Sequence, residues 1–188
     1  QGMSNRVFAI ADTHFGHMKL AIGERGFTCV EEHDDELITR WNERVGPQDV
    51  VYHLGAVGLR PPRALKPILD RLDGRIRLIR GNHEKSAMHK LCRDRFEWIK
   101  DVYELKMPDG NRIWLSHYAH LIWPKAHYGA WHCYGHSHGS LAESETRRAM
   151  DVGVDAHGFY PIGYDTVVAT LAARGFVAID HHDEEYAA

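Results

Sequence analysis

Four short clusters of histidine and oxygen-bearing side chains recur along the chain, each directly after a short apolar run. They are Asp12 with His14, Asn82 with His83, His117 alone, and His136 with His138. Imidazole and carboxylate groups are good ligands for Zn²⁺, Mn²⁺, Fe²⁺ or Ni²⁺, and three widely spaced cysteines argue against a thiolate site. One closed tetrahedral site needs only four ligands. The supply of donors therefore favours two adjacent metal ions.

Each cluster also has a structural interpretation that involves no metal. Asp12 is a common type of residue for a turn after a strand, and Asn82 could cap a following helix. His117 could simply end a hairpin strand, and the glycine-flanked His136 and His138 could form a surface loop. Any one cluster alone permits these interpretations, but the recurrence of all four in order favours metal ligation.

The elements expected around the first clusters explain how distant residues would meet. Apolar runs predict strands at 7–11, 49–54 and 76–79, and apolar periodicity predicts helices at 34–44 and from Pro62 onward. This alternation predicts parallel strands joined by right-handed crossovers. Polar clusters at the carboxyl ends of such strands gather at one edge of the sheet.

The second half of the chain is expected to be richer in strands. A turn signal at 108–111 predicts a hairpin of strands at 102–107 and 112–116, with His117 directly after it. The further predicted elements are strands at 131–134, 148–152 and 176–180 and a helix at 164–174. The clusters in this half are therefore also positioned by strand ends.

Together, the motifs D-x-H, G-N-H, a lone strand-end histidine and G-H-x-H resemble the metal-site signature of the calcineurin-like metallophosphoesterases. The layout is most similar to the small, single-domain bacterial and phage phosphoesterases of that superfamily. The resemblance implies an α/β fold, a metallophosphoesterase-type sandwich of two mixed β-sheets flanked by helices, and one domain over residues 3–188. Gln1 and Gly2, which precede Met3, are interpreted as the remnant of a cleavable tag.

The resemblance also implies roles for individual residues. It assigns Asp12, His14 and His138 to one metal ion and Asn82, His117 and His136 to the other. It implies that His83 contacts the phosphate and protonates the leaving oxygen. Arg80 and His17 lie near enough to the motifs in sequence to help bind phosphate. Two ions about 3.5–4 Å apart would clamp the phosphoryl group. The implied activity is hydrolysis of a phosphodiester or phosphomonoester, with Mn²⁺ among the candidate ions and a nucleotide or short oligonucleotide among the candidate substrates.

One position departs from the family pattern. The family's second strand ends in Gly-Asp, and that Asp bridges the two metals, whereas this chain has Gly55-Ala56. Two dications about 3.7 Å apart repel by roughly 18 kcal/mol even at an effective dielectric constant of ~20, and alanine offers no charge to offset this. We therefore expect reduced occupancy of the two divalent ions and greatly reduced turnover. Ala56 is interpreted as a deliberate inactivating substitution, the alternative being a natural pseudoenzyme.

The composition is that of a folded domain and argues against several classes of protein. Of the 188 residues, 44% are hydrophobic and 26% charged, and the formal net charge of −3 disfavours a general binder of polyanions. No apolar run reaches the roughly 18–20 residues of a membrane span, so no membrane association is expected. Sparse cysteine fits a reducing environment and predicts a cytoplasmic location. The sequence assigns no oligomeric state.

Two other functions remain open. A catalytically inactive protein could bind a phosphate or nucleotide at the same site, which is the outcome that Ala56 would permit. A nuclease acting on short single strands is disfavoured by the net charge, although basic residues concentrate between 60 and 77. Such a run is also typical of a solvated helix face.

Residues outside the motifs are expected to be structural. The aromatic residues of 118–131 could stack a nucleobase, but a small second core under the loop is favoured. His53 is expected in the core, bonded to backbone, and His33 on the surface. Asp151 and Asp155 are interpreted as residues that order a loop rather than bind metal.

Overall fold

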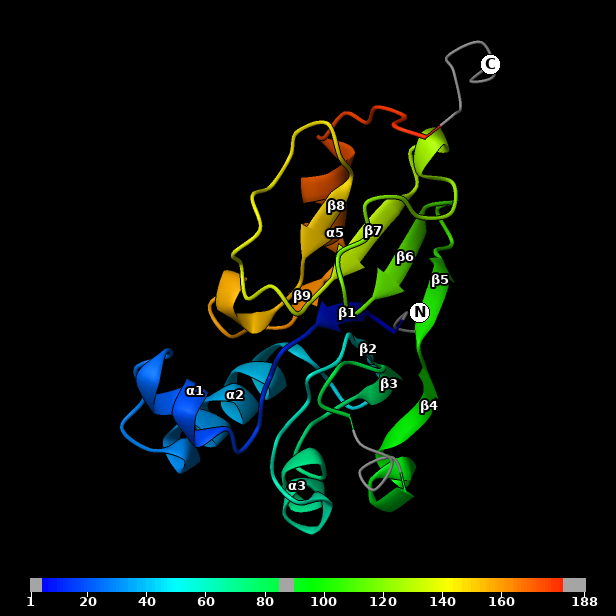
Figure 1. The fold of residues 1–188 in the computed structure, drawn as a ribbon. Coiled ribbons are helices and arrows are strands. Elements are labelled where there is room, and N and C mark those ends of the chain that lie inside the picture. The colour runs from blue at the N-terminus through cyan, green and yellow to red at the C-terminus, as the bar shows by residue number, and fades with distance from the viewer. Residues whose placement is uncertain (1–4, 85–89, 181–188) are drawn as a thin grey trace.

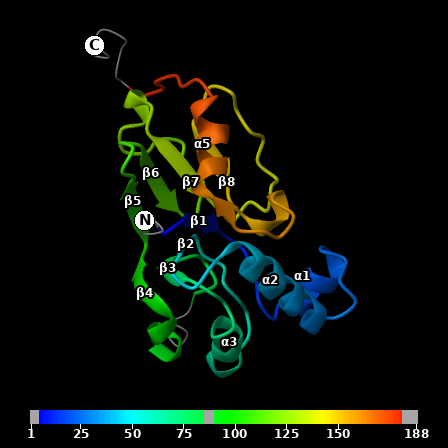
Figure 2. The ribbon, with the colours of Figure 1, turned by 180° about the vertical axis from the view of Figure 1, so that it is seen from behind.

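Two mixed β-sheets packed against each other form the centre of the molecule (Figures 1 and 2). The structure is a computed structural model that describes residues 5–84 and 90–180. The first sheet has the strand order β4-β3-β2-β1-β9, in which β9 alone runs antiparallel to its neighbour. Its strands are β1 (Val7–Ile10), β2 (Val50–His53), β3 (Arg75–Ile79), β4 (Phe96–Lys100) and β9 (Ile162–Gly163).

The second sheet has the order β5-β6-β7-β8, with β5 antiparallel to β6 and the other pairs parallel. Its strands are β5 (Val102–Lys106), β6 (Arg112–Ser116), β7 (Trp131–Tyr134) and β8 (Ala149–Asp151). The helices are α1 (Met18–Gly23), α2 (Val30–Arg44), α3 (Pro62–Leu69) and α5 (Tyr164–Ala172). The predicted α/β arrangement of two mixed sheets flanked by helices is confirmed.

Strand β1 separates two hydrophobic cores because its side chains point alternately to opposite faces. Phe8 and Ile10 pack with Trp41 of α2 in a core that also contains residues of α3. Ala9 faces the other way, into a core between the two sheets to which Leu171 of α5 contributes. Both faces of β1 are therefore covered, which explains why its sequence, VFAI, is a continuous apolar run.

The carboxyl ends of the parallel strands meet at one edge, where the candidate site lies. Strands β1, β2 and β3 are parallel neighbours, so the loops that follow them emerge side by side. Strands β6 and β7 are also parallel and end just before His117 and His136. A bridge between Ala11 and Gly153 joins the end of β1 to the loop after β8, which brings the second sheet's loops to the same edge.

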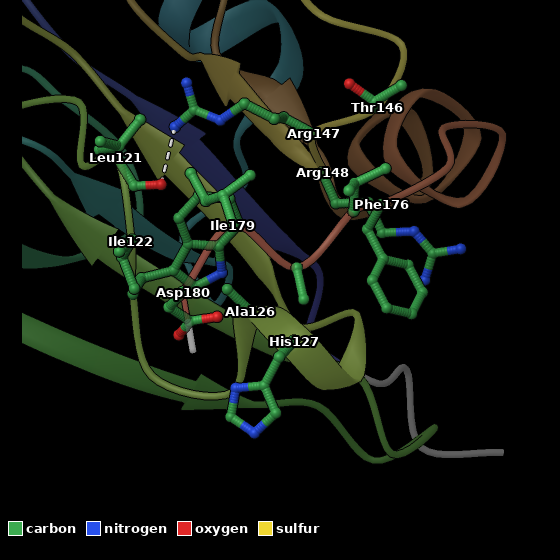
Figure 3. Close-up of a pocket in the computed structure, with 13 residues that line it drawn as sticks. Leu121, Ile122, Ala126, His127, Thr146, Arg147, Arg148, Phe176, Ile179 and Asp180 are labelled. Carbon is green, nitrogen blue, oxygen red and sulfur yellow. Dashed lines mark hydrogen bonds between the residues drawn. The ribbon is translucent and has the colours of Figure 1, made fainter. Parts of the chain in front are cut away.

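The structure differs from the predicted elements at several places. Helix α2 begins at Val30, four residues before the predicted start, because the Cys29 side chain accepts a hydrogen bond from the Glu32 amide and caps it. The predicted strand at 176–180 is wrong. This segment has one backbone hydrogen bond to the chain preceding β8, from Val177 N to Thr146 O. Its apolar side chains instead line a hollow together with Leu121 and Ile122 (Figure 3).

No helix within residues 5–84 and 90–180 combines the length and the apolar character that crossing a membrane would need.

Candidate metal centre

Backbone strain is concentrated in the loops at the carboxyl edge of the strands. Among the described residues, seven non-glycine residues have positive φ, and five of them lie in these loops. The five are Asp12 (58°), His14 (51°), Ala56 (54°), His136 (67°) and His138 (49°). The left-handed conformation costs an ordinary residue about 1–2 kcal/mol, although Asp, Asn and His adopt it more readily. Ala56 thus shares the unusual backbone of four predicted ligands without sharing their chemistry.

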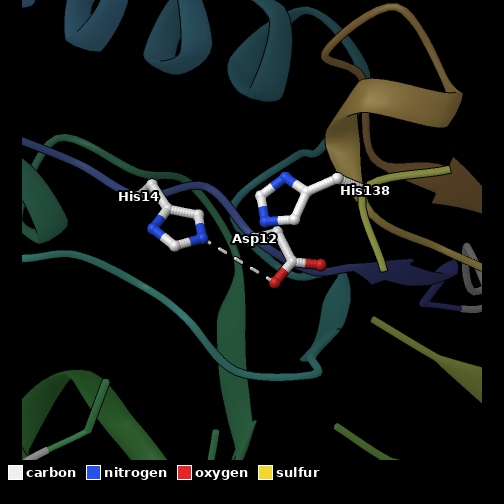
Figure 4. Close-up of side chains that lie close together, drawn as sticks. All are labelled: Asp12, His14 and His138. Atoms are coloured by element: carbon white, nitrogen blue, oxygen red, sulfur yellow. Dashed lines mark ion pairs between the residues drawn. The ribbon is translucent and has the colours of Figure 1, made fainter. Parts of the chain in front are cut away.

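Asp12, His14 and His138 form the first cluster (Figure 4). One ligand atom from each residue lies within 4.8 Å of the others. Asp12 Oδ1 is 3.9 Å from His14 Nε2, and both atoms are buried without a hydrogen-bond partner among the described residues. A buried, unpaired polar group costs about 1–3 kcal/mol. A carboxylate and two imidazoles that converge in this way fit a divalent metal ion.

The remaining atoms of the first cluster are already fixed by hydrogen bonds. Asp12 Oδ2 accepts a bond of 2.7 Å from the His136 amide, which leaves Oδ1 for a ligand. His138 Nδ1 is bonded to Asp155 Oδ2 at 2.7 Å, which leaves its Nε2. Burial raises the pKa of Asp12 to about 7, and burial also lowers the pKa of His14 to about 2. His14 therefore remains neutral near pH 7, and its nitrogen lone pair is available to a metal.

Asn82, His117 and His136 form the second cluster. His117 Nδ1 donates to the Leu54 carbonyl at 2.6 Å, so Nε2 of the neutral ring is an acceptor. That Nε2 lies 2.9 Å from Asn82 Oδ1, which is also an acceptor unless the amide turns its NH₂ group inward. The His136 ring stands edge-on to His117, with 5.1 Å between ring centroids. Two acceptors that face each other also fit a cation, but this cluster contains no carboxylate.

Glu84 joins the two loops that carry Ala56 and Asn82. Its buried carboxylate accepts hydrogen bonds from the amides of Ala56 (3.1 Å), Val57 (2.7 Å) and Gly81 (2.5 Å). The backbones are packed so closely that a Cβ at Gly81 would lie 2.7 Å from the Ala56 nitrogen. Glu84 therefore holds the loops together with oxygens that are occupied by amides. Sequence analysis missed it, although it directly follows the G-N-H motif.

The residues predicted to contact phosphate have different surroundings. The half-buried His83 lies beside His14, with 5.1 Å between ring centroids, and His17 Nδ1 is 3.4 Å from His14 Nδ1. Burial lowers the pKa of His17. Arg80 is exposed, and its guanidinium donates to Asp101 at 2.5 Å. His83 and His17 thus line the first cluster, whereas Arg80 would have to leave Asp101 to bind a phosphate.

Two histidines outside the motifs differ from expectation. His53 is buried as predicted, but it bonds to the Thr13 hydroxyl at 3.0 Å rather than to backbone. The prediction that His33 is exposed is wrong, because it is fully buried and bonds to Arg25 and Asp34. The guanidinium of Arg25 contacts both His33 and the Asp12 carbonyl, and the sequence did not indicate this role. Its position in the loop before α2 gave no signal of contact with the site.

The aromatic residues of 118–131 divide into a core and a surface group. Trp123 packs with Tyr134 in a small separate core, as the favoured interpretation predicted, whereas Trp131 belongs to the core between the sheets. Tyr118 and Tyr128 are exposed. Tyr118 lies against His136, with ring centroids 4.6 Å apart, so its side chain borders the second cluster.

The chain is similar to proteins from archaea and phages. No family model matches it. It is 32% identical over 190 residues to the gene 66 protein of Mycobacterium phage D29, which covers 85% of this chain and 93% of that protein. It is 29% identical over 174 residues to the uncharacterized protein MJ1445 of Methanocaldococcus jannaschii, covering 88% and 91% of the two chains.

A solved structure supports the architecture. The protein of unknown function AQ665 from Aquifex aeolicus superposes with a TM-score of 0.68 at 20% identity, covering 88% of this chain and 99% of that one. At this level of identity the likeness shows that the two chains share a fold.

Proposed function

The chain belongs to the family of the gene 66 protein of Mycobacterium phage D29, and we propose that its fold carries a metal-dependent phosphoesterase site that is impaired in this chain by Ala56. The observation that carries the proposal is the first cluster. Asp12 Oδ1 and His14 Nε2 are buried and unpartnered among the described residues, and they converge with His138 from a loop more than a hundred residues away. The motif order that resembles the metallophosphoesterases adds to this support.

Six residues would hold the metal ions. Asp12, His14 and His138 would bind one divalent ion, and Asn82, His117 and His136 a second. Mn²⁺, Fe²⁺, Ni²⁺ and Zn²⁺ all suit these imidazole, amide and carboxylate donors. When bound, such ions act as Lewis acids that polarise a phosphoryl group. The Leu54 carbonyl and the Asp155 carboxylate orient His117 and His138 through the Nδ1 atoms, so that both present Nε2.

His83 is the proposed general acid. It is half-buried beside His14, so it can face the leaving oxygen of a substrate held at the cluster. His17 also lies beside His14, where it would help to bind the phosphate. We propose a nucleotide-like phosphate ester as the substrate, with the exposed ring of Tyr118 beside the second cluster as a surface for its organic part.

Ala56 weakens the second cluster through charge. Asp12 is the one carboxylate of the matched ligand set, and Glu84 accepts from three backbone amides. An aspartate at position 56 would suit the backbone, whose φ of 54° is more favourable for Asp than for Ala. We therefore propose that this chain binds one ion well and the second poorly.

The test is the variant Ala56→Asp, reconstituted with Mn²⁺ beside the parent chain. Metal content should rise from about one ion to about two, and hydrolysis of bis-p-nitrophenyl phosphate or of p-nitrophenyl phosphate should rise about 100-fold or more. The comparison of these two substrates distinguishes a diesterase from a monoesterase. The double variant Ala56→Asp, Asp12→Asn is the control and should lose the gain. Equal metal content and equal rates in parent and Ala56→Asp would contradict the proposal.

A binding protein is the second candidate, and Ala56 is the observation that favours it. In that case Ala56→Asp would cleave neither substrate, while the parent would retain measurable affinity for a nucleotide. A nuclease is less favoured, because basic residues of the 60–77 segment are already paired with acids. Lys66 contacts Asp70 and Asp94, and Arg77 contacts Glu97.

A further inference from the structure

Arg25 is buried at the back of the first cluster with all its donors in use. The side chain is 2% exposed, and its five N–H groups have five acceptors. Two of them go to the Asp155 carboxylate, both at 2.8 Å. The others reach the Asp12 carbonyl (2.6 Å), the Thr13 carbonyl (3.0 Å) and His33 Nε2 (2.8 Å). One guanidinium thus ties the loop after β1 to Asp155 and to α2.

Asp155, which Arg25 holds in place, also contacts the predicted metal ligand His138. Its Oδ2 bonds to Arg25 and also to His138 Nδ1, in the latter case at 2.7 Å. An ionised carboxylate accepts only, so Nδ1 of His138 must carry a proton, and in the neutral ring Nε2 is the free nitrogen. The bidentate bond to Arg25 keeps the carboxylate in one orientation, and through it the plane of the imidazole ring.

Arg25 connects the loop that carries Asp12 to the carboxylate that holds His138, so it contacts one ligand loop directly and the other through Asp155. Asp12 lies in the loop whose carbonyls Arg25 binds, and His138 is held by the carboxylate that Arg25 binds. In the second cluster, His117 Nδ1 rests on a neutral backbone carbonyl instead. A carboxylate behind an imidazole raises its basicity as a ligand more than a carbonyl does.

We propose that Asp155, oriented by Arg25, is a positioning residue that fixes His138 as a metal ligand through Nε2 and preserves the first cluster as a one-ion site in spite of Ala56. The proposal rests on the proposed function in one respect, which is that the first cluster binds a divalent ion. It adds two residues that lie outside the matched motif and that do not touch the ion.

The experiment measures Mn²⁺ binding by calorimetry in the parent and in Asp155→Asn. Asparagine has the same shape, but it has no charge, and its carboxamide has one accepting oxygen and a donating NH₂ group in place of the second oxygen. We expect affinity to fall about 10- to 100-fold, the usual effect of losing such a partner. Asp94→Asn is the matched control, because it also removes an ion-paired carboxylate, here the partner of Lys66 on the surface, and it should leave affinity unchanged.

A second measurement needs no metal. Nitrogen chemical shifts of the imidazole rings should report the Nδ1–H form of His138 in the parent and a change of tautomer population in Asp155→Asn. Arg25→Lys, which cannot hold the carboxylate in the same bidentate way, should give an intermediate loss of affinity.

The outcomes separate the two proposals. A parent chain that binds no ion overturns the metal site, and with it the proposed function. A parent that binds Mn²⁺ while Asp155→Asn binds it equally well, with an unchanged His138 tautomer, overturns the positioning role alone. Circular dichroism shows whether Asp155→Asn is folded. If it is unfolded, the Mn²⁺ affinity and the His138 tautomer of Arg25→Lys test the positioning role instead.

Discussion

The two halves of the candidate centre are built from similar residue types but have different support. In the first cluster Asp12 and His14 are buried and His138 is half-buried, with the Asp155–Arg25 pair behind it. The second is more open, since Asn82 and His136 are exposed, and among residues 5–84 and 90–180 the side-chain anion that supports it, Glu84, acts indirectly through the loop backbone. The loop that should supply its carboxylate carries Ala56.

This contrast indicates that one cluster can bind a metal ion when the other does not. Attraction between ligands and a dication depends on the negative charge close to it, and low dielectric strengthens that attraction. The first cluster has charge and burial, so it can hold an ion alone. The second has neutral donors, so we expect it to depend on a shared anion.

The largest effect is expected from Asp12→Asn in the otherwise unchanged chain. This substitution removes the carboxylate of the first cluster. Mn²⁺ affinity should therefore fall further than in Asp155→Asn, where the expected loss is about 10- to 100-fold. Calorimetry with Mn²⁺ measures it, and Asp94→Asn again serves as the control. If Asp12→Asn still bound one ion with the parent's affinity, the stronger half of the centre would have been misidentified.

The next effect concerns stability rather than metal. Glu84→Gln removes the charge that three backbone amides share and turns an NH₂ group toward donors. Hydrogen bonds to a charged group contribute about 1.5–3 kcal/mol, so the free energy of unfolding should drop by roughly that amount. Urea denaturation without metal measures it. An unchanged midpoint would mean that the loops after β2 and β3 are held together by packing alone.

Much of this contrast could be predicted from the sequence, because local patterns determine it. Apolar runs placed strands before Asp12, Ala56 and His117, and the parallel arrangement brought their ends together. The order of the motifs then indicated which residues meet. Ala56 was expected to be the weak point because the family that the motifs resemble has Asp at this position.

The supporting residues could not be predicted in this way. Asp155 was expected to order a loop, but Arg25 was not singled out, and the contact between these two residues, 130 positions apart, depends on how the loops pack. His33 looked like a surface histidine, yet it is buried by its contacts with Arg25 and Asp34. The segment 176–180 has the apolar pattern of a strand, but most of its backbone has no strand partner in the described structure.

Acidification should lower the Mn²⁺ affinity of the first cluster by about tenfold per pH unit for each proton that the metal displaces. Burial raises the pKa of Asp12 to about 7, and the bond to Asp155 raises the pKa of His138. Both groups bind metal only when deprotonated, so affinity should be retained above pH 7 and lost as pH falls through it. Burial lowers the pKa of His117, so binding at that ring should release little proton near pH 7. Calorimetry of Mn²⁺ binding in buffers of different ionisation enthalpy counts the released protons, and a count of zero at pH 7 would contradict this assignment.

The smallest effect in the parent, and the most informative about the second cluster, is expected from Asn82→Ala. With Ala56 present, the second ion is already poorly held, so removing the Asn82 amide should change metal content by less than about twofold. In an Ala56→Asp background the same substitution should abolish the second ion, because an anion at position 56 makes the neutral donors effective. The parent, the two single variants and the double variant form a thermodynamic cycle, and the metal content of each is measured. Equal losses in both backgrounds would show that the two positions act independently, and then the weakness of the second cluster could not be attributed to the missing carboxylate at Ala56.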